Sequence, residues 1–162
     1  MKIFKKQQFV NVDPIKVYNV ISDINHYHRF IPFCSSSKIL HTKTEYQLET
    51  PLNRTVRMDA ELSIAFYKFK ESYISQVECI PYSYVKATSS SKLFKQLDTT
   101  WNIKGNYKDK ECLIEYILEY EFNMLLYEKL SQLVFDSMSI KMMDAFVQEI
   151  QRQHLNETSQ HS

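Results

Sequence analysis

Hydrophobic and polar residues alternate along much of the chain, and this alternation predicts β-strands. The segment "RTVRMDAELSIAFYKF" shows the pattern most clearly. One face of this strand would be apolar, and the other would carry charged residues such as Arg57, Asp59 and Glu61. A strand with one apolar and one polar face is typical of an antiparallel sheet that covers a core on one side. The residues that would share the apolar face are Val56, Met58, Ala60, Leu62, Ile64 and Phe66.

Similar segments before and after this one predict an antiparallel sheet of about seven strands. Residues 3–10 alternate in a mixed pattern that is typical of an edge strand. In "KECLIEYILEYEF" the glutamates fall on one side, which indicates a solvated face rather than a catalytic one. The remaining strand segments are "FCSSSKILHTK", "ESYISQVECI", "YSYVKATSS" and "LFKQLDTTWNIKG".

Two short helices are predicted between the first and second strands. Asp13 can cap the first helix and Pro14 suits its first turn, because a cap supplies an acceptor for free amides and proline has no amide to satisfy. Asp23 can cap the second helix, and Pro32 would end it. The polypeptide would then return to strands from Phe33.

The period becomes helical in residues 125–150, which predicts one long amphipathic helix. Residues 154–162 carry no pattern, so we expect a disordered tail there and a single domain over residues 1–153. The residues expected on the apolar side of the helix are Leu126, Leu130, Val134, Met138, Met142 and Ala145 or Phe146, with Leu133 beside them.

A sheet of this size must curl, because strands twist, and a helix laid over its concave face can leave space for an apolar ligand. The same apolar faces are required in any two-layer fold, so the residues are also candidates for an ordinary core. The indole N–H of Trp101 needs a partner if buried, and either a ligand carbonyl or a backbone carbonyl would serve. The candidate lining residues are Leu62, Ile64, Phe66, Val77, Leu97, Trp101, Leu130, Val134, Met138 and Met142.

Composition and charge narrow the possible functions. The chain has 162 residues, of which 44% are hydrophobic and 14% aromatic, which fits one globular domain with room for a core. A net charge of +1 provides no global field for nucleic acid or anionic lipid. The sequence lacks an apolar run long enough to span a membrane, and "MKIFKKQQF" does not resemble a secretory signal. We therefore expect a soluble protein that is not exported.

Cysteine and histidine spacing gives no sign of a metal site. Cys34, Cys79 and Cys112 lie far apart, which argues against both a disulfide framework and a CxxC metal motif. His26 and His28 are close together, but further ligands at a recognisable spacing are missing. We expect no metal, three reduced cysteines and a surface position for the two histidines.

Catalytic motifs are also missing from the sequence. Most strand carboxylates fall on the expected outer faces, and Asp98 and Glu71 are the only ones near the inward set. A single glycine excludes a glycine-rich phosphate loop, and there is no GxSxG elbow. These features favour a binding protein with no catalytic cofactor over an enzyme.

The segment "YNVISDINHYHRFIPFC" resembles the opening helix pair of the coenzyme Q-binding protein (Coq10) family, a branch of the START-like, polyketide cyclase-related superfamily. The segments "AELSIAF", "YISQVEC", "LFKQLDTTWNI" and "VFDSMSIKMMDAF" are similar to later blocks of that family, in the same order. The resemblance extends from about residue 2 to about residue 152.

This resemblance implies an α+β helix-grip fold, with the pocket between a curved antiparallel sheet and the C-terminal helix. It also implies that ubiquinone is the bound ligand. Residues that match motif positions of the family are Leu62, Glu71 and Trp101, and those that match its first loop are Pro32, Phe33 and Cys34.

The family further implies a mitochondrial quinone chaperone or carrier, needed for respiration and efficient ubiquinone biosynthesis. It would lie peripherally on the matrix side of the inner membrane, with the ubiquinone-synthesis complex or respiratory complexes as further partners and no nucleic acid. The two alternatives are a cyclase- or hydrolase-like enzyme of the same superfamily and a ribosome-associated binding protein.

A membrane contact is expected where the last strand leads into the long helix. Apolar residues crowd this corner beside Lys129, although the same residues would also suit a buried helix start. The candidate contact residues are Met124, Leu125, Leu126 and Tyr127.

Overall fold

A computed structural model describes residues 1–46, 54–66, 69–92, 94–106, 108, 110–123 and 125–160. The element order over these residues is one strand, two short helices, six strands and one long helix, as the sequence predicts. The helices are α1 (Pro14–Ser22), the 3₁₀ helix η1 (Ile24–Arg29) and α2 (Leu125–Gln160). The strands are β1 (Lys2–Val10), β2 (Cys34–Tyr46), β3 (Arg54–Phe66), β4 (Phe69–Ile80), β5 (Tyr84–Ser89), β6 (Phe94–Asn106) and β7 (Glu111–Phe122).

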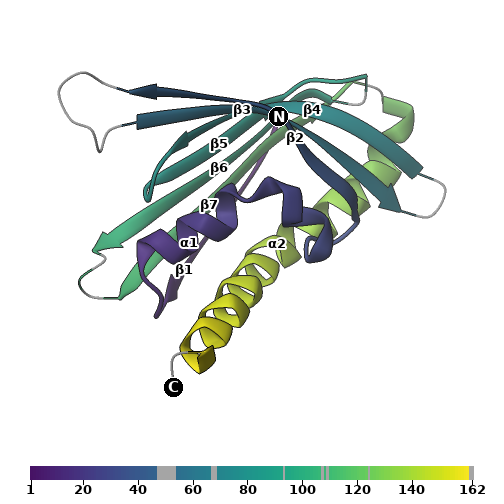
Figure 1. The fold of residues 1–162 in the computed structure, drawn as a ribbon. Coiled ribbons are helices and arrows are strands. Elements are labelled where there is room, and N and C mark those ends of the chain that lie inside the picture. The colour runs from purple at the N-terminus through teal and green to yellow at the C-terminus, as the bar shows by residue number, and fades with distance from the viewer. Residues whose placement is uncertain are drawn as a thin grey trace.

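The described strands form one antiparallel sheet in the order β1-β7-β6-β5-β4-β3-β2. Strands β2 to β7 each pair with their neighbours in sequence, whereas β1 pairs with β7 at the opposite edge from β2. Helices α1 and η1 therefore carry the chain from one edge of the sheet to the other. Figure 1 shows both on the same side of the sheet as α2. This confirms the helix-grip arrangement of a curved sheet with a long helix over its concave face.

The concave face of the sheet is apolar and the other face is polar, as alternation predicts. Glu115 lies on the outer face of β7, where its carboxylate accepts hydrogen bonds from Gln7 Nε2 at 2.9 Å and from Asn102 Nδ2 at 2.8 Å. These bonds lower the pKa of Glu115, so this carboxylate serves cross-strand contacts rather than the interior. The buried residues of β7 are Cys112, Ile114, Tyr116, Leu118 and Tyr120.

The start of α1 forms as the sequence predicts, but the start of η1 differs. The carboxylate of Asp13 accepts a hydrogen bond from the Lys16 amide at 3.0 Å, and Pro14 occupies the first turn of the helix. Asp23 stands at the N-cap position of η1 without capping it through its side chain. Its carboxylate instead binds Nδ1 of His26, and the backbone carbonyl of Asp23 accepts from the His26 amide at 3.1 Å.

The last helix is longer than the sequence pattern predicts. Residues 154–160, which we expected in a disordered tail, form the end of α2. Lys16 of α1 contacts this segment, with its Nζ 3.2 Å from His154 Nδ1 and 3.0 Å from Glu157 Oε2. Polar contacts of this kind do not appear as an apolar period in the sequence, so the pattern could not predict this part of the helix. Among the described helices, none is both long and apolar enough to cross a membrane.

Gly105 allows β6 and β7 to approach closely just before their connection. It pairs directly with Cys112 of β7. A Cβ atom at position 105 would lie 2.6 Å from the Cβ of Cys112 and 2.7 Å from the carbonyl oxygen of Glu111. Because both neighbours belong to a buried or backbone position, the strands would have to separate to admit a side chain.

Replacing Gly105 by alanine should therefore lower the free energy of unfolding by about 1–3 kcal/mol through overpacking. Urea denaturation of the purified protein measures this change. Lys104→Ala, at the exposed neighbouring position, is the matched control and should stay within about 0.5 kcal/mol of the parent. Equal stability of G105A and the parent would contradict the close approach of the two strands.

Candidate ligand-binding cavity

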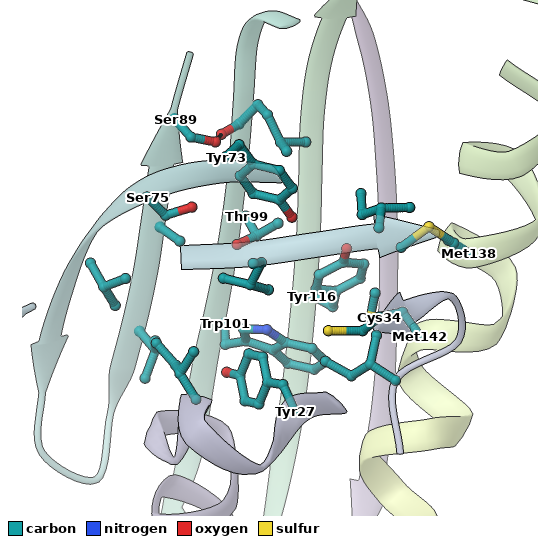
Figure 2. Close-up of a pocket in the computed structure, with 18 of the residues that line it drawn as sticks. Tyr27, Cys34, Tyr73, Ser75, Ser89, Thr99, Trp101, Tyr116, Met138 and Met142 are labelled. Atoms are coloured by element: carbon teal, nitrogen blue, oxygen red, sulfur yellow. Dashed lines mark hydrogen bonds between the residues drawn. The ribbon is translucent and has the colours of Figure 1, made fainter. Parts of the chain in front are cut away.

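An apolar cavity of about 80 Å³ lies between the concave face of the sheet and the helices that cover it. Figure 2 shows side chains from β4, β6 and β7 facing it, with η1 and α2 closing the other side. The strands β2 to β7, η1 and α2 all contribute residues to it. The lining residues are Ile24, Tyr27, Ile31, Cys34, Leu62, Ile64, Tyr73, Ser75, Val77, Val85, Ala87, Ser89, Leu97, Thr99, Trp101, Tyr116, Met138, Met142 and Phe146.

The structure brings together many of the residues that the sequence nominated for ligand binding. They come from alternating positions on the three strands β3, β4 and β6 and from one side of α2. Their common position against one cavity follows from the inward parity of each strand. The nominated residues in the lining are Leu62, Ile64, Val77, Leu97, Trp101, Met138 and Met142.

Three nominated residues lie outside the cavity lining that the structure describes. Pro32 and Phe33 belong to the turn between η1 and β2, where Phe33 has a φ of 62° and its carbonyl accepts from the Ala65 amide at 2.9 Å. Phe33 packs against the core from the side, and it is the next residue, Cys34, that reaches the cavity. Glu71 has the inward parity of β4, opposite Ile64, but it stands too near the strand start to reach the lining.

Several other nominated positions cannot be placed. The side chains of Phe66, Leu130 and Val134 lie outside the described residues. The same holds for the expected membrane contact, Met124 to Tyr127. Both assignments therefore stay predictions.

The lining also contains residues that the sequence reasoning did not select. Tyr73, Ser75 and Thr99 occupy inward positions of β4 and β6, in step with Val77 and Trp101. A search for apolar residues passed over them because they carry hydroxyl groups, although strand parity alone would have found them. Polar side chains are thus built into the apolar face.

An aromatic cluster joins the sheet to α2 beside the cavity. The rings of Trp101 and Tyr116 have their centroids 4.5 Å apart, and Phe146 of α2 lies 4.5 Å from Trp101. Phe146 also meets Tyr27 edge-on at 5.2 Å and Phe30 at 5.0 Å. Aromatic pairs at these separations add to the hydrophobic gain of burial. One ring of α2 therefore contacts both the sheet and η1.

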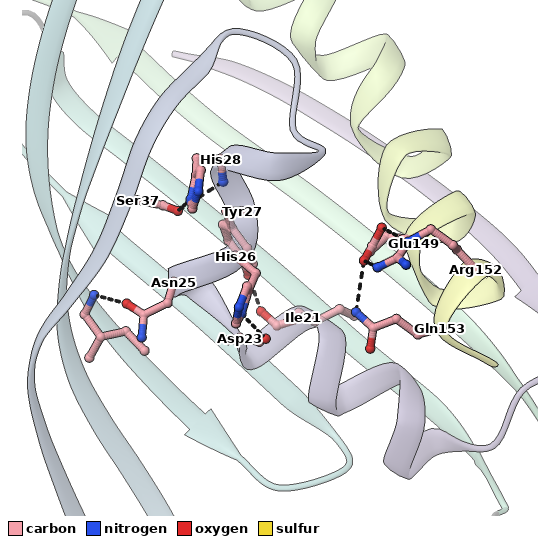
Figure 3. A network of polar contacts seen from close by, with 11 residues as sticks. Ile21, Asp23, Asn25, His26, Tyr27, His28, Ser37, Glu149, Arg152 and Gln153 are labelled. Atoms are coloured by element: carbon pink, nitrogen blue, oxygen red, sulfur yellow. Dashed lines mark hydrogen bonds and ion pairs between the residues drawn. The ribbon is translucent and has the colours of Figure 1, made fainter. Parts of the chain in front are cut away.

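Helix η1 is held against the sheet by polar contacts at its surface, as Figure 3 shows. The amide of His28 donates to the hydroxyl of Ser37 on β2 at 3.0 Å. The side-chain oxygen of Asn25 accepts from the Ile39 amide at 2.7 Å. In the described structure His28 thus serves to attach η1 to β2. These bonds fix the helical turn that carries Tyr27 into the cavity.

The described lining is uncharged. It has no carboxylate, imidazole or amine, and its polar groups are hydroxyls, one thiol and the indole N–H of Trp101. Asp98, which the sequence left open as a candidate acid, lies on the outer face of β6 and accepts from Gln96 Nε2 at 2.7 Å. Burial raises the pKa of the Tyr27, Tyr73 and Tyr116 phenols well above their ordinary value. A site of this kind binds neutral, largely apolar molecules.

The family model described as "Polyketide cyclase / dehydrase and lipid transport" matches residues 10–147, which include α1, η1, the strands β2 to β7 and the cavity lining. The chain belongs to this family. The match covers most of the chain, including the part of α2 that carries Met138, Met142 and Phe146.

Curated relatives of the chain are named as coenzyme Q-binding proteins. "Coenzyme Q-binding protein COQ10, mitochondrial" of Drosophila melanogaster is 29% identical over 152 residues, covering 92% of this chain and 58% of that protein. The Xenopus laevis homolog B is 28% identical, over 85% of this chain and 53% of its own length. The chain thus spans little more than half of these two relatives. The Schizosaccharomyces pombe protein is 26% identical over 95% of this chain and 90% of its own length.

Solved structures share the fold at low sequence identity. An 18 kDa protein from Caulobacter crescentus has a TM-score of 0.71 at 17% identity, covering 95% of this chain and 99% of its own. An aromatase/cyclase from Streptomyces has a TM-score of 0.70 at 12% identity, covering 94% of each chain. A START superfamily protein from Mycobacterium smegmatis has a TM-score of 0.67 at 13% identity, over 93% of this chain and 98% of its own. These likenesses establish a START-like fold.

The reactivity of Cys34, whose thiol lines the cavity, tests whether this site is buried. Burial raises the pKa of Cys34 to about 11, and those of Cys79 and Cys112 also to about 11. At pH 8 all three should be protonated and should react with iodoacetamide much more slowly in the native protein than in urea. Because the folded pKa lies above the ordinary value of 9.0, the thiols' contribution to stability is complete below about pH 9 and is lost as the pH rises through about 11.

Mass spectrometry after timed labelling measures this reactivity site by site. Protein unfolded in urea at the same pH is the control. Labelling of Cys34 in the native protein at the unfolded rate would contradict its buried position in the cavity wall.

Proposed function

We propose that this protein binds ubiquinone in the cavity between the sheet and α2 and carries it without chemical turnover. The observation on which the proposal rests is a neutral lining of aromatic, aliphatic and hydroxyl side chains. The names of the curated relatives support ubiquinone as the ligand. A quinone ring is flat, uncharged and bears carbonyl oxygens, which suits aromatic walls with a few hydrogen-bond donors.

Entry of the quinone must widen the cavity. Its volume of about 80 Å³ is smaller than the roughly 300–1,000 Å³ typical of small-molecule sites. Met138 and Met142 provide the means, because unbranched thioether side chains repack at little cost. Met142 is already only half-buried at the helix–sheet contact. The cavity would thus open between α2 and the sheet.

The isoprenoid tail makes a membrane-bound carrier more plausible than a free one. Exposing the tail to water costs about 0.8 kcal/mol for each CH₂ group, so the part that the cavity cannot enclose would stay in a bilayer. We place the protein peripherally on the matrix side of the mitochondrial inner membrane, which agrees with the mitochondrial names of its relatives. There it would deliver ubiquinone for respiration and for ubiquinone biosynthesis, in contact with the synthesis complex or respiratory complexes.

We favour binding over catalysis because acid–base chemistry needs a group that exchanges protons near neutral pH. In the described lining, burial keeps the phenols and the Cys34 thiol protonated. The cyclase-like likeness among solved structures concerns the fold. Turnover of a quinone or polyketide by the purified protein would overturn this part of the proposal, and salt-dependent RNA binding would favour ribosome association instead.

Binding can be followed through Trp101, the only tryptophan, whose ring lines the cavity. A short-tailed ubiquinone should quench its fluorescence with a saturable, stoichiometric titration. Ala87→Leu should weaken binding by about tenfold or more, because the larger side chain fills the cavity from β5. Extraction and mass spectrometry of the purified protein should recover a quinone.

The matched control is Thr88→Leu, the next residue on β5, which faces away from the cavity. This variant should bind like the parent. Thermal melting of both variants separates loss of the site from loss of the fold. Absence of saturable quenching in the parent protein, or recovery of phospholipid alone, would point to a general lipid carrier.

Membrane contact has its own test at the start of α2. Replacing both Leu125 and Leu126 by serine should reduce binding to liposomes, because these residues are the expected apolar contact. Leu155→Ser, an exposed leucine near the other end of α2, is the control and should leave liposome binding unchanged. Co-sedimentation with liposomes measures the effect. Equal sedimentation of the double variant and the parent would remove this contact from the proposal.

A further inference from the structure

Three hydroxyl groups face the cavity from three different strands. Tyr73 comes from β4, Thr99 from β6 and Tyr116 from β7. Figure 2 shows the Tyr73 and Tyr116 hydroxyls pointing toward one another across the cavity, with Thr99 beside them. The two phenols also interact electrostatically, since a negative charge on Tyr73 would raise the pKa of Tyr116. The fold thus gathers three oxygens at one place in an apolar space.

Some interior hydroxyls have a hydrogen-bond partner within the described residues, and others, Ser75 as well as Tyr73, Thr99 and Tyr116, have none. Tyr27 donates to the carbonyl of Ile21, and Ser89 donates to the carbonyl of Leu97 at 3.2 Å. Tyr120, on the same face of β7 as Tyr116, binds Asp136 at 3.3 Å. The described structure gives no such bond to Tyr73, Thr99 or Tyr116.

Unpartnered polar groups in an apolar interior are unfavourable and rare in native proteins. Tyr116 is only 1% exposed, whereas Tyr73 and Thr99 are partly buried. Phenylalanine would fill the same space without this penalty. A ligand oxygen in the cavity would complete the hydrogen bonds of these hydroxyls.

We infer that Tyr73, Thr99 and Tyr116 form the polar end of the cavity and hold a carbonyl oxygen of the quinone ring by hydrogen bonds. The inference rests on the proposed function and adds how the head group is recognised. Trp101, whose ring packs against Tyr116, supplies the aromatic wall for the ring of the ligand. The hydroxyls fix the position of the head group, and the apolar lining accommodates the rest.

Neutral hydroxyls suit both redox states of a quinone. Burial keeps the Tyr73 and Tyr116 phenols protonated at neutral pH, so each can donate to a quinone carbonyl. Each phenol oxygen can also accept a hydrogen bond from a ring hydroxyl after reduction. No proton has to enter or leave the protein when either form binds. The site therefore accepts quinone and hydroquinone by the same contacts.

The test compares Tyr73→Phe, Tyr116→Phe and Thr99→Val with the parent protein. Each substitution removes a hydroxyl and keeps the shape of the side chain nearly unchanged. The dissociation constant of a short-tailed ubiquinone, from Trp101 quenching, should rise about 3- to 10-fold for each lost hydrogen bond. Tyr120→Phe is the matched control, because its hydroxyl binds Asp136 outside the lining, and it should bind quinone like the parent.

Infrared spectroscopy supplies a readout that packing alone would not change. With carbonyl-labelled quinone, the bound carbonyl stretch should lie below its frequency in an apolar solvent, as expected of a hydrogen-bonded carbonyl. The shift should shrink in the Tyr73→Phe and Tyr116→Phe variants and persist in Tyr120→Phe. Because the parent protein alone gives the first result, the test does not depend on the variants folding.

The outcomes separate this inference from the proposed function. If the parent does not bind quinone, the proposed function fails and the inference with it. If the parent binds quinone with an unshifted carbonyl band, or if the phenylalanine variants bind as tightly as the parent, the hydroxyls are not the recognition site while quinone binding stands.

Discussion

The contact between Phe146 and the rings around it determines how α2 can cover the sheet. Phe146 meets Trp101 from β6 at 4.5 Å and Tyr27 from η1 at 5.2 Å, so one side chain joins sheet, short helix and long helix. The neighbours Met143 and Ile150 on α2 are fully buried. Met142, beside Met143, lines the cavity and is only half-buried. The helix is thus attached at one part of the concave face, and the cavity lies beside that attachment.

Sequence periodicity predicted the fold because the alternation of apolar and polar residues in each strand indicates which side faces the core. In β7 the alternation of buried and outer residues is unbroken from Cys112 to Tyr120. The turn after η1 and the end of α2 have no such apolar pattern. They make single polar contacts, such as the Phe33 carbonyl with Ala65 and Lys16 with Glu157, which pattern alone does not reveal.

The cavity was harder to predict than the fold. Choosing apolar residues on inward faces placed Leu62, Trp101 and Met138 in the lining, but it omitted Tyr73 and Thr99 on the same faces. Position along a strand matters as well, because Glu71 has the correct parity and still lies beyond the cavity. Parity decides the face of a residue, and only the crossing of α2 and η1 decides which part of that face borders a space.

The hydroxyls in the lining contribute less to stability than apolar side chains would at the same positions. An interior selected for packing alone would replace Tyr116 by phenylalanine and Thr99 by valine, since an unpaired hydroxyl gains nothing there. The cavity of about 80 Å³ points the same way, because native interiors usually close such spaces with side chains. A space lined by methionine side chains, which repack easily, and by hydroxyls has the properties of a site that gains contacts when a ligand enters. Stability given up in the free protein would then be recovered as binding energy, which would link the hydroxyls of the lining to the proposed carrier function.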